Sequence, residues 1–264
     1  MTRLVGIVNL TADSFSDGGR YLDPEPALAH ARALRADGAD VVELGPASSR
    51  PEAVAVTAEE ECRRLEPVID VLVAEGIPVG IDSWQPATQR WAIAHGACML
   101  NDIRGFPDPT MYPVLAAADC ALVIMHSVEG GPRATRVHVE PATIVERVSA
   151  FLGARAAALE AAGVPRERLI VDPGMGLFLG SDPEASVAVL RAVGELHQRL
   201  GLPVLISVSR KSFLGALAGR GIGARGAATL AAELFAAARG AAWIRTHDAG
   251  ALRDALRVTA ALGG

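Results

Sequence analysis

The chain has 264 residues, half of them hydrophobic, with 25 basic and 30 acidic side chains and a formal net charge of −5. This composition predicts a folded chain rather than a disordered one, and its acidic balance argues against a broad nucleic-acid-binding face. No apolar run approaches the roughly 20 residues of a spanning helix, and the 3 cysteines lack disulfide or metal spacing, so we expect a soluble cytoplasmic protein that binds neither membranes nor nucleic acid.

Short β-branched runs alternate with longer Ala-, Leu-, Arg- and Glu-rich stretches, a pattern typical of repeated strand–helix units. In chain order, the predicted strands span residues 4–9, 40–45, 78–83, 98–103, 121–126, 168–173, 203–210 and 242–247. The predicted helices lie near 24–37, 57–75, 86–96, 109–118, 141–162, 183–200, 224–239 and 248–262. Thr57 and Glu60 form a capping-box pattern, and Pro86 and Pro183 occupy first-turn positions.

This series of units predicts an α/β fold, a single (β/α)8 TIM barrel that forms one domain over residues 1–264. An open doubly wound sheet is the alternative. It is less favoured because the stretch after the first strand, NLTADSFSDGG, lacks the glycine spacing of a dinucleotide-binding turn. Long polar segments near 10–22, 46–56 and 127–140 are candidate loops over an active site.

Three rare residues draw attention to the carboxyl ends of the predicted strands. The chain contains one lysine, Lys211, and two asparagines, Asn9 and Asn101, and each lies at such an end. In a barrel these ends converge on one pocket. The polar residues that they bring there are Asn9, Glu43, Asp82, Asn101, His126, Asp172, Lys211, Arg245 and His247. We therefore expect an active site at this face.

The chemistry of these residues indicates two subsites. Carboxylates, a carboxamide and an ammonium group suit a polar heteroaromatic bicycle better than a sugar or an aliphatic acid. These groups belong to Asp82, Asn101, Asp172 and Lys211. A second group, Arg245 and His247 with Asn9, is typical of an anion site on the last strand. Asn9, together with Asp13 or Asp17, is also a candidate ligand for a hard divalent cation.

The stretch SRKS, residues 209–212, places two cations side by side. Neighbours on a strand point to opposite faces, so only one of Arg210 and Lys211 can enter the pocket. A deep, compact charge favours Lys211, and Arg210 is then expected to be a structural ion-pair partner.

Taken in order, eight motifs resemble dihydropteroate synthase across essentially the whole chain. They are IVNLTADSFSDGG (7–19), SSRP (48–51), GIDS (80–83), NDIRG (101–105), IMH (124–126), DPGMG (172–176), SRKSFLG (209–215) and IRTHD (244–248). The resemblance implies a barrel that is commonly a homodimer. It also implies an enzyme that joins 6-hydroxymethyl-7,8-dihydropterin pyrophosphate to 4-aminobenzoate, releasing pyrophosphate and giving 7,8-dihydropteroate for folate synthesis.

The resemblance assigns roles to matching positions. The pterin would contact Asp82, Asn101, Met125, Asp172 and Lys211. The pyrophosphate would contact Asn9, Arg245 and His247, with Mg²⁺ beside Asn9. The 4-aminobenzoate site and its loops would include Phe15, Asp17, Ser49, Arg50, Pro51 and Ser212, together with Lys211. The catalytic groups would be Asp82, Asp172, Lys211 and Arg245, whereas His126 is expected to be structural.

Two segments depart from the family pattern on the side of the second substrate. The loop reads GPASSRPEA where the family usually has GGESTRPGA, so that Pro46, Ala47, Ser49 and Glu52 differ. After DPGMG stand Leu177, Phe178 and Leu179. In the family a phenylalanine directly follows this motif, and Leu177 or a shifted Phe178 are the two candidates to replace it. These departures motivate an alternative, a repurposed or non-catalytic pterin-binding paralogue. A corrinoid-linked methyltransferase domain is less favoured because it would not need Arg245 and His247.

Overall fold

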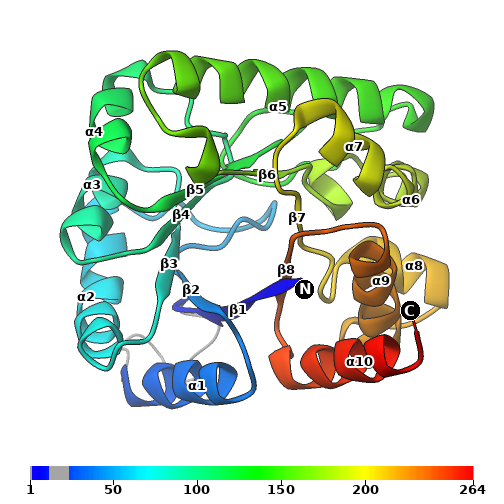
Figure 1. Cartoon of the computed structure of the whole chain (residues 1–264), viewed down its shortest axis with the longest axis horizontal. Helices are drawn as coiled ribbons and strands as arrows, with labels where there is room; N and C mark the ends of the chain where they lie inside the picture. Colours follow the sequence, from blue (N-terminus) through cyan, green and yellow to red (C-terminus); the bar gives the residue numbers. More distant parts are fainter. Residues whose placement is uncertain (1, 12–23, 264) are drawn as a thin grey trace.

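The computed structural model describes residues 2–11 and 24–263 of the chain (Figure 1). Its strands are β1 (Arg3–Asn9), β2 (Val41–Gly45), β3 (Val79–Asp82), β4 (Met99–Asp102), β5 (Ala121–Met125), β6 (Leu169–Asp172), β7 (Leu205–Ile206) and β8 (Trp243–Thr246). All their pairings are parallel, and they form one 8-stranded sheet in the order β6-β5-β4-β3-β2-β1-β8-β7. A parallel bridge between Val171 and Val204 joins the two edges. The predicted (β/α)8 TIM barrel is confirmed.

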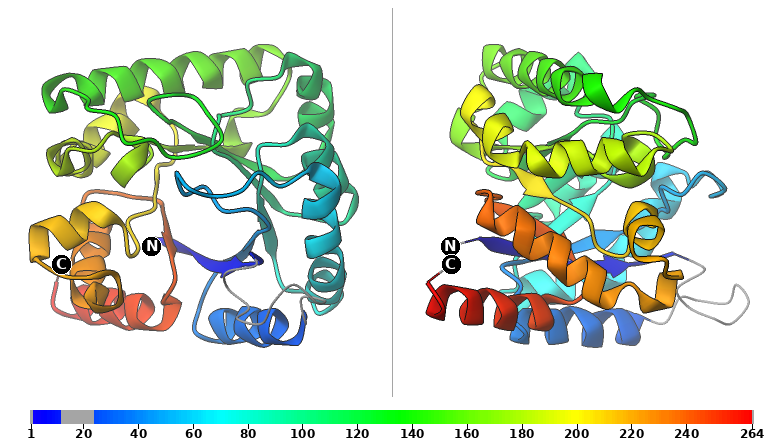
Figure 2. Two further views of the ribbon diagram at one scale, coloured as in Figure 1. Left: turned by 180° about the vertical axis from the view of Figure 1, so that it is seen from behind. Right: turned by 90° about the vertical axis from the view of Figure 1, so that its right-hand side faces the viewer.

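The helices form a ring outside the strands (Figures 1 and 2). They are α1 (Pro24–Ala36), α2 (Ala58–Ala74), α3 (Pro86–Ala94), α4 (Tyr112–Ala117), α5 (Ile144–Ala161), α6 (Pro183–Arg191), α7 (Val193–Leu200), α8 (Ser212–Ala218), α9 (Gly226–Ala238) and α10 (Ala249–Ala261). Pro86 and Pro183 begin α3 and α6 as predicted. Thr57 caps α2 by accepting the Glu60 N–H at 3.2 Å. The Glu60 carboxylate binds Arg63 and Arg64.

Three differences from the predicted elements lie between residues 183 and 218. The strand predicted over 203–210 is confined to Leu205–Ile206, and α8 was not predicted. Beyond the end of β7 the chain turns at Arg210, which adopts a φ of 60°. Its backbone groups bond instead to the Thr229 hydroxyl and the Arg225 guanidinium. The helix predicted over 183–200 is divided at Ala192 into α6 and α7.

Apolar side chains fill the barrel below its carboxyl rim. They come from seven strands and are Val5, Val41, Met99, Val123, Ile170, Leu205 and Trp243. A larger cluster fills the space between the strands and the helix ring. Burial of this kind contributes roughly 25 cal/mol per Å² of apolar surface. The interior is therefore packed, and polar chemistry is confined to the rim.

Two loops that follow β2 and β5 project from the carboxyl side of the barrel, at the right of the right-hand view in Figure 2. They meet through a hydrogen bond from Ala134 N–H to the Ser49 carbonyl at 2.9 Å. An exposed salt bridge of 2.7 Å joins Arg136 to Glu52. The segments near 46–56 and 127–140 therefore lie over the predicted face. No helix in the described part of the chain is long and apolar enough to cross a membrane.

Candidate active site at the carboxyl ends of the strands

The strand register brings the predicted residues to one rim. Asp82 on β3 is the register partner of Asn101 on β4. Met125 on β5 pairs in the same way with Asp172 on β6. Asn9 ends β1 and is exposed to solvent. These five predicted residues, far apart in sequence, thus lie at the carboxyl ends of their strands, and four of them form two register pairs.

A buried ion network links four of the strands. Arg245 on β8 donates from Nη2 to Asp82 Oδ2 at 2.8 Å and from Nε to Glu43 Oε1. Glu43 on β2 is fully buried and also accepts a hydrogen bond of 3.1 Å from Asn101 Nδ2. The sequence placed Glu43 at a strand end without giving it a role. Glu43 and Arg245 are 202 residues apart in the sequence, so no local sequence pattern predicted their contact.

The charged groups of this network are poorly solvated, and this burial shifts the pKa values of Asp82, Asp172 and Arg245. Burial raises the pKa of Asp82 to about 7, with Arg245 opposing the shift and Glu43 adding to it. Burial likewise raises the pKa of Asp172, against the opposing charge of Lys211. Burial disfavours the charge of Arg245, but Glu43 and Asp82 outweigh it and raise the pKa of the guanidinium. These opposing charges depend on one another to remain ionised.

Asn101 has one polar atom that the protein leaves without a partner. Its Nδ2 donates to Glu43, whereas its buried Oδ1 has no hydrogen-bond partner among the described residues. Buried polar atoms are nearly always paired in folded proteins. An N–H donor on a bound molecule would satisfy this oxygen.

Lys211 was predicted at the end of a strand, but it lies past the end of β7, directly before α8. It caps the start of α8, and its Nζ donates to the Met175 carbonyl at 3.1 Å. Its alkyl chain lies against Gly176, and its ammonium is 4.8 Å from the centre of the Phe178 ring. Burial lowers the pKa of Lys211 to about 8, while Asp172 opposes the shift.

Arg210 lies in the turn before α8, with an exposed side chain and a backbone φ of 60°. Its charge lies close enough to His247 to lower the pKa of that ring. The ion pairs among residues that the structure describes do not include Arg210, and its structural ion pair stays a prediction. The turn is held through its backbone instead.

His247 is held by Ser209 from the same turn. The Ser209 hydroxyl oxygen accepts the His247 backbone N–H at 3.2 Å and lies 2.9 Å from Nδ1. When this hydroxyl donates to Nδ1, the ring proton resides on Nε2. Burial, with the nearby charges of Arg210 and Arg245, lowers the pKa of His247 to about 3. His247 is therefore a neutral hydrogen-bond donor at neutral pH rather than a cation.

The turn after β6 explains the DPGMG motif. Gly174 has a φ of 72°, and a Cβ there would lie 2.4 Å from the His126 carbonyl oxygen. Its N–H donates to Asp172 Oδ1 at 2.7 Å and so fixes that carboxylate. His126 is buried, donates from Nδ1 to the Pro173 carbonyl at 3.2 Å, and has a pKa lowered to about 4 by burial. These contacts support the structural role expected for His126.

Residues expected near the second substrate lie around the same rim. Ser212 begins α8 and is exposed, and Ser49, Arg50 and Pro51 lie in the loop after β2. A small cavity of about 80 Å³ opens between this loop and Asp82, with Ser48, Ser49, Trp84, Ile103 and Arg133 in its lining. Phe15, Asp13 and Asp17 lie outside the described residues.

An apolar cluster beside Lys211 shows which residue replaces the phenylalanine that directly follows DPGMG in the family. Phe178 packs with Ile103 and Met125, and Leu177 and Trp84 lie against this cluster. Phe178 is the residue whose ring approaches the Lys211 ammonium. Of the two candidates, Phe178 is therefore the aromatic neighbour of the site.

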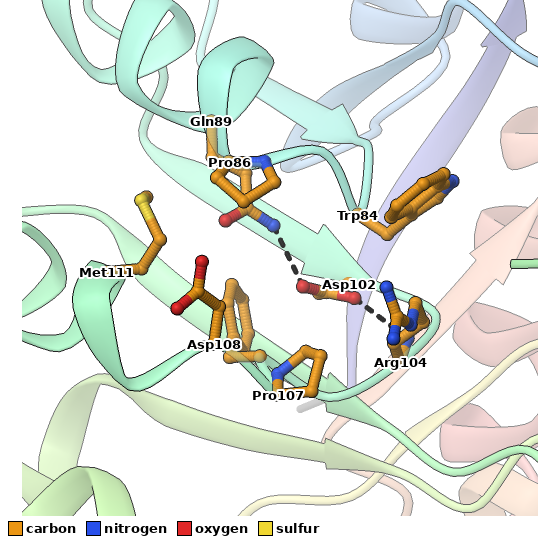
Figure 3. Close-up of a pocket in the computed structure, with 9 residues that line it drawn as sticks. Trp84, Pro86, Gln89, Asp102, Arg104, Pro107, Asp108 and Met111 are labelled. Atoms are coloured by element: carbon orange, nitrogen blue, oxygen red, sulfur yellow. Dashed lines mark hydrogen bonds between the residues drawn. The ribbon is translucent and has the colours of Figure 1, made fainter. Parts of the chain in front are cut away.

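A larger cavity of about 200 Å³ lies beside the strand-end residues and contains none of the predicted ones (Figure 3). Trp84, Gln89, Asp102, Arg104 and Met111 are among the residues that line it. The Arg104 guanidinium lies 5.2 Å from the centre of the Trp84 ring. Gln89 and Asp102 are joined across one wall of the cavity. Neither residue followed from sequence motifs as a functional one.

The donor set at the rim fits a phosphate-bound Mg²⁺ better than a metal held by protein alone. Clusters of three or more His, Cys, Asp or Glu side chains suited to a metal are absent from the described part of the chain. Asn9 offers one exposed neutral oxygen next to Gly45, whose missing side chain leaves room beside it. Mg²⁺ commonly uses one or two protein oxygens and takes its other ligands from phosphate and water.

Comparisons with known proteins agree with this geometry. Residues 5–247 match a family described as pterin binding enzyme. The chain is 58% identical to a type-2 dihydropteroate synthase of Escherichia coli over 259 residues, covering 98% of this chain and 95% of the relative.

Two solved structures from Xanthomonas albilineans are also similar. A dihydropteroate synthase with 4-aminobenzoic acid gives a TM-score of 0.90 at 40% identity, covering 100% of this chain and 93% of that one. The enzyme in complex with 7,8-dihydropteroate gives a TM-score of 0.86 at 38% identity, covering 100% and 94%. The chain therefore belongs to the dihydropteroate synthase family of pterin-binding enzymes.

Proposed function

We propose that this chain is an active dihydropteroate synthase, a transferase that joins 6-hydroxymethyl-7,8-dihydropterin pyrophosphate to 4-aminobenzoate. The observation that carries the proposal is the buried network of Arg245, Asp82, Glu43 and Asn101, which leaves Asn101 Oδ1 without a donor. A pterin supplies the ring N–H and amino groups that such oxygens accept. The bound molecules named for its relatives, 4-aminobenzoic acid and 7,8-dihydropteroate, support the same pair of substrate and product.

In this proposal the dihydropterin lies across the ends of β3, β4 and β6. The Asp172 and Asp82 carboxylates and the Asn101 amide oxygen accept its N–H groups, and Lys211 donates to a ring oxygen or nitrogen. Met125 and Phe178 supply the apolar contact to the ring faces. The site favours a cationic ring because two of its carboxylates lie in poorly solvated positions.

The reaction then proceeds by breaking the bond between the exocyclic methylene and the pyrophosphate oxygen. The electron-rich ring delocalises the positive charge that forms, and Asp82 and Asp172 stabilise it. The 4-aminobenzoate nitrogen forms the new bond to the methylene, and its proton passes to pyrophosphate or solvent. No covalent enzyme intermediate is required.

The departing pyrophosphate would be bound by Asn9, Arg245 and neutral His247. Arg245 supplies charge, whereas His247 donates from Nε2 when Ser209 donates to Nδ1. We propose that Mg²⁺ binds beside Asn9, where it would neutralise charge on the phosphate oxygens.

The 4-aminobenzoate site would lie between the start of α8 and the loop after β2. Ser212 and Lys211 line one side, and Ser49, Arg50 and Pro51 lie on the other. We expect Phe15 and Asp17 to complete it. Contact between the two rim loops, through Ser49 and Ala134, supports a closed site that excludes water.

A single assay separates synthase activity from the alternative of a non-catalytic pterin-binding paralogue. Purified protein is incubated with the dihydropterin pyrophosphate, Mg²⁺ and 4-aminobenzoate, and dihydropteroate is detected by chromatography. We expect turnover that depends on all three components. Tight pterin binding without product would contradict the proposal and support the paralogue.

We further propose that the enzyme is a cytoplasmic homodimer. The free thiols of Cys62, Cys98 and Cys120 are compatible with a reducing compartment. Several exposed large apolar side chains, Leu217, Ile222, Phe235, Val258 and Leu262, lie on the last helices and the segments between them. Sedimentation velocity tests the dimer, and a concentration-independent monomer would contradict it.

A further inference from the structure

A buried glutamine joins the two strands that carry Asp82 and Asn101. Gln89 on α3 is 2% exposed. Its Nε2 donates to the Ser83 carbonyl at 2.9 Å and to Asp102 Oδ2 at 2.9 Å. Ser83 directly follows Asp82, and Asp102 directly follows Asn101. One side-chain nitrogen therefore connects the carboxyl ends of β3 and β4, and Figure 3 shows its bond to Asp102.

Other buried contacts hold the same two ends. The Ser83 N–H donates to the Asn101 carbonyl at 3.1 Å, and Asp102 Oδ1 accepts the Arg104 N–H at 2.7 Å. Glu61 on α2 is 1% exposed and accepts the Ser83 hydroxyl at 2.5 Å. In such a poorly solvated place, each hydrogen bond is strong and each unpaired group is costly. Both strand ends are thus fixed from the helix side.

We propose, on the basis of the proposed function, that Gln89 is a positioning residue for the dihydropterin subsite. Asp82 and Asn101 are register partners whose side chains must stay aligned to accept neighbouring N–H groups of one ring. Among the described residues, the Gln89 side chain bonds to Ser83 and Asp102, which lie directly after them, so it acts through these two neighbours and does not touch the substrate. Loss of this link lets β3 and β4 move relative to one another at the point where the ring binds.

The test compares two glutamines at the start of α3. Gln89→Met keeps the side-chain length and removes both hydrogen bonds. Gln85→Met is the matched control, because the bond that Gln85 Nε2 makes within the described part of the chain is to the Val56 carbonyl, at 3.1 Å. Dihydropterin pyrophosphate with Mg²⁺ is titrated calorimetrically without 4-aminobenzoate, and both KM values are measured.

For Gln89→Met we expect the pterin Kd and KM to rise about tenfold. This is roughly the effect on binding of losing one hydrogen bond. The KM for 4-aminobenzoate should stay within about twofold, and Gln85→Met should leave the pterin Kd unchanged. If Gln89→Met does not fold, Asp102→Asn tests the same link, since it turns an amide donor toward Gln89 while keeping an acceptor for Arg104.

A lower melting temperature with an unchanged pterin Kd would show that Gln89 is only structural and would overturn the inference. Equal losses in the Gln89 and Gln85 variants would overturn it as well. Wild-type protein that does not bind dihydropterin pyrophosphate would contradict the proposed function itself, so the two failures are distinguishable.

Discussion

At the residue scale, Lys211 is the one lysine among 25 basic side chains, and its surroundings suit a compact ammonium. Its chain runs past Gly176, and its charge lies close to the Phe178 ring and the Met175 carbonyl. A guanidinium is wider and planar, so it cannot make the same single contact in that space.

We therefore expect Lys211→Arg to weaken dihydropterin binding by about 100-fold although the charge is retained. Calorimetric titration of the pterin pyrophosphate measures the effect. Arg210→Lys is the matched control, because that neighbouring side chain is exposed and keeps its charge, and the variant should bind like wild type. A nearly silent Lys211→Arg would refute the role assigned to the lone lysine.

Two of the titrating groups of the pterin subsite, Asp82 and Lys211, predict how activity depends on pH. The Asp82 pKa is raised from 3.8 to about 7, so its carboxylate is gained as pH rises through about 7. The Lys211 pKa is lowered from 10.5 to about 8, so its charge is lost above about 8. Since kcat/KM reports the free enzyme, we expect a bell-shaped profile for the pterin substrate with its maximum between these values.

The measurement is a kcat/KM profile from about pH 5.5 to about pH 9.5. The Asp82→Asn variant should lose the acidic limb and keep the basic one. A profile that is flat for the wild-type enzyme across this range would contradict the assignment.

At the element scale, the turn between β7 and α8 sets the positions of Ser209 and Lys211. Arg225 reaches across Gly215 of α8 to donate to the Arg210 carbonyl at 2.9 Å. A Cβ on Gly215 would lie 2.4 Å from Arg225 Nε. A Cβ at this position would therefore displace the Arg225 side chain that holds the turn.

Alanine normally stabilises a helix over glycine by about 1 kcal/mol. We expect Gly215→Ala to lower both the melting temperature and kcat/KM, because Arg225 must leave the Arg210 carbonyl. Gly221→Ala is the control, since a Cβ there meets nothing within 4 Å. Thermal melts and initial rates compare the two, and a stabilised Gly215→Ala would contradict this reading of the turn.

The same turn is a place where the sequence pattern did not predict the structure. The β-branched run of 203–208 has the composition of a strand, but the Arg210 backbone that follows it bonds to Arg225 and Thr229, which lie farther along the chain. Composition cannot reveal such partners. By contrast, Pro86, Pro183 and the β1–β6 strand ends were predicted because their signals are local: a fixed φ, a cap or a short apolar run.

At the scale of the whole molecule, the barrel brings the carboxyl ends of its strands together at one face. The residues of the rim could therefore be predicted from the sequence. The convergence of Asp82, Asn101, Asp172, Lys211 and Arg245 follows from the fold alone. The pairing of Arg245 with Glu43 and the link through Gln89 did not follow. These two contacts depend on which polar side chains lie next to each other in the folded protein, and a sequence motif does not predict this.

The stability of the whole fold should depend on pH through a buried acid outside the site. Burial raises the pKa of Glu233 on α9 from 4.5 to about 8, so the folded state holds its proton more tightly than the unfolded chain. Its stabilising contribution is complete below about 4.5 and is lost as pH rises through about 8.

We expect Glu233→Gln to flatten this dependence, so that the melting temperature of the variant exceeds that of the wild type by more at pH 9 than at pH 5. Differential scanning fluorimetry of both proteins measures the difference. Curves that remain parallel between these pH values would contradict a protonated, buried Glu233.

The central claim is that the rim of the barrel holds a dihydropterin against Asp172, Asn101 and Asp82. A crystal structure with dihydropterin pyrophosphate and Mg²⁺ bound tests it most directly. The account predicts N–H groups of the ring within hydrogen-bond distance of Asn101 Oδ1 and the Asp172 carboxylate, with the pyrophosphate beside Asn9 and His247. A ring bound instead in the neighbouring cavity of Figure 3, with Asn101 Oδ1 still unpaired, would contradict it.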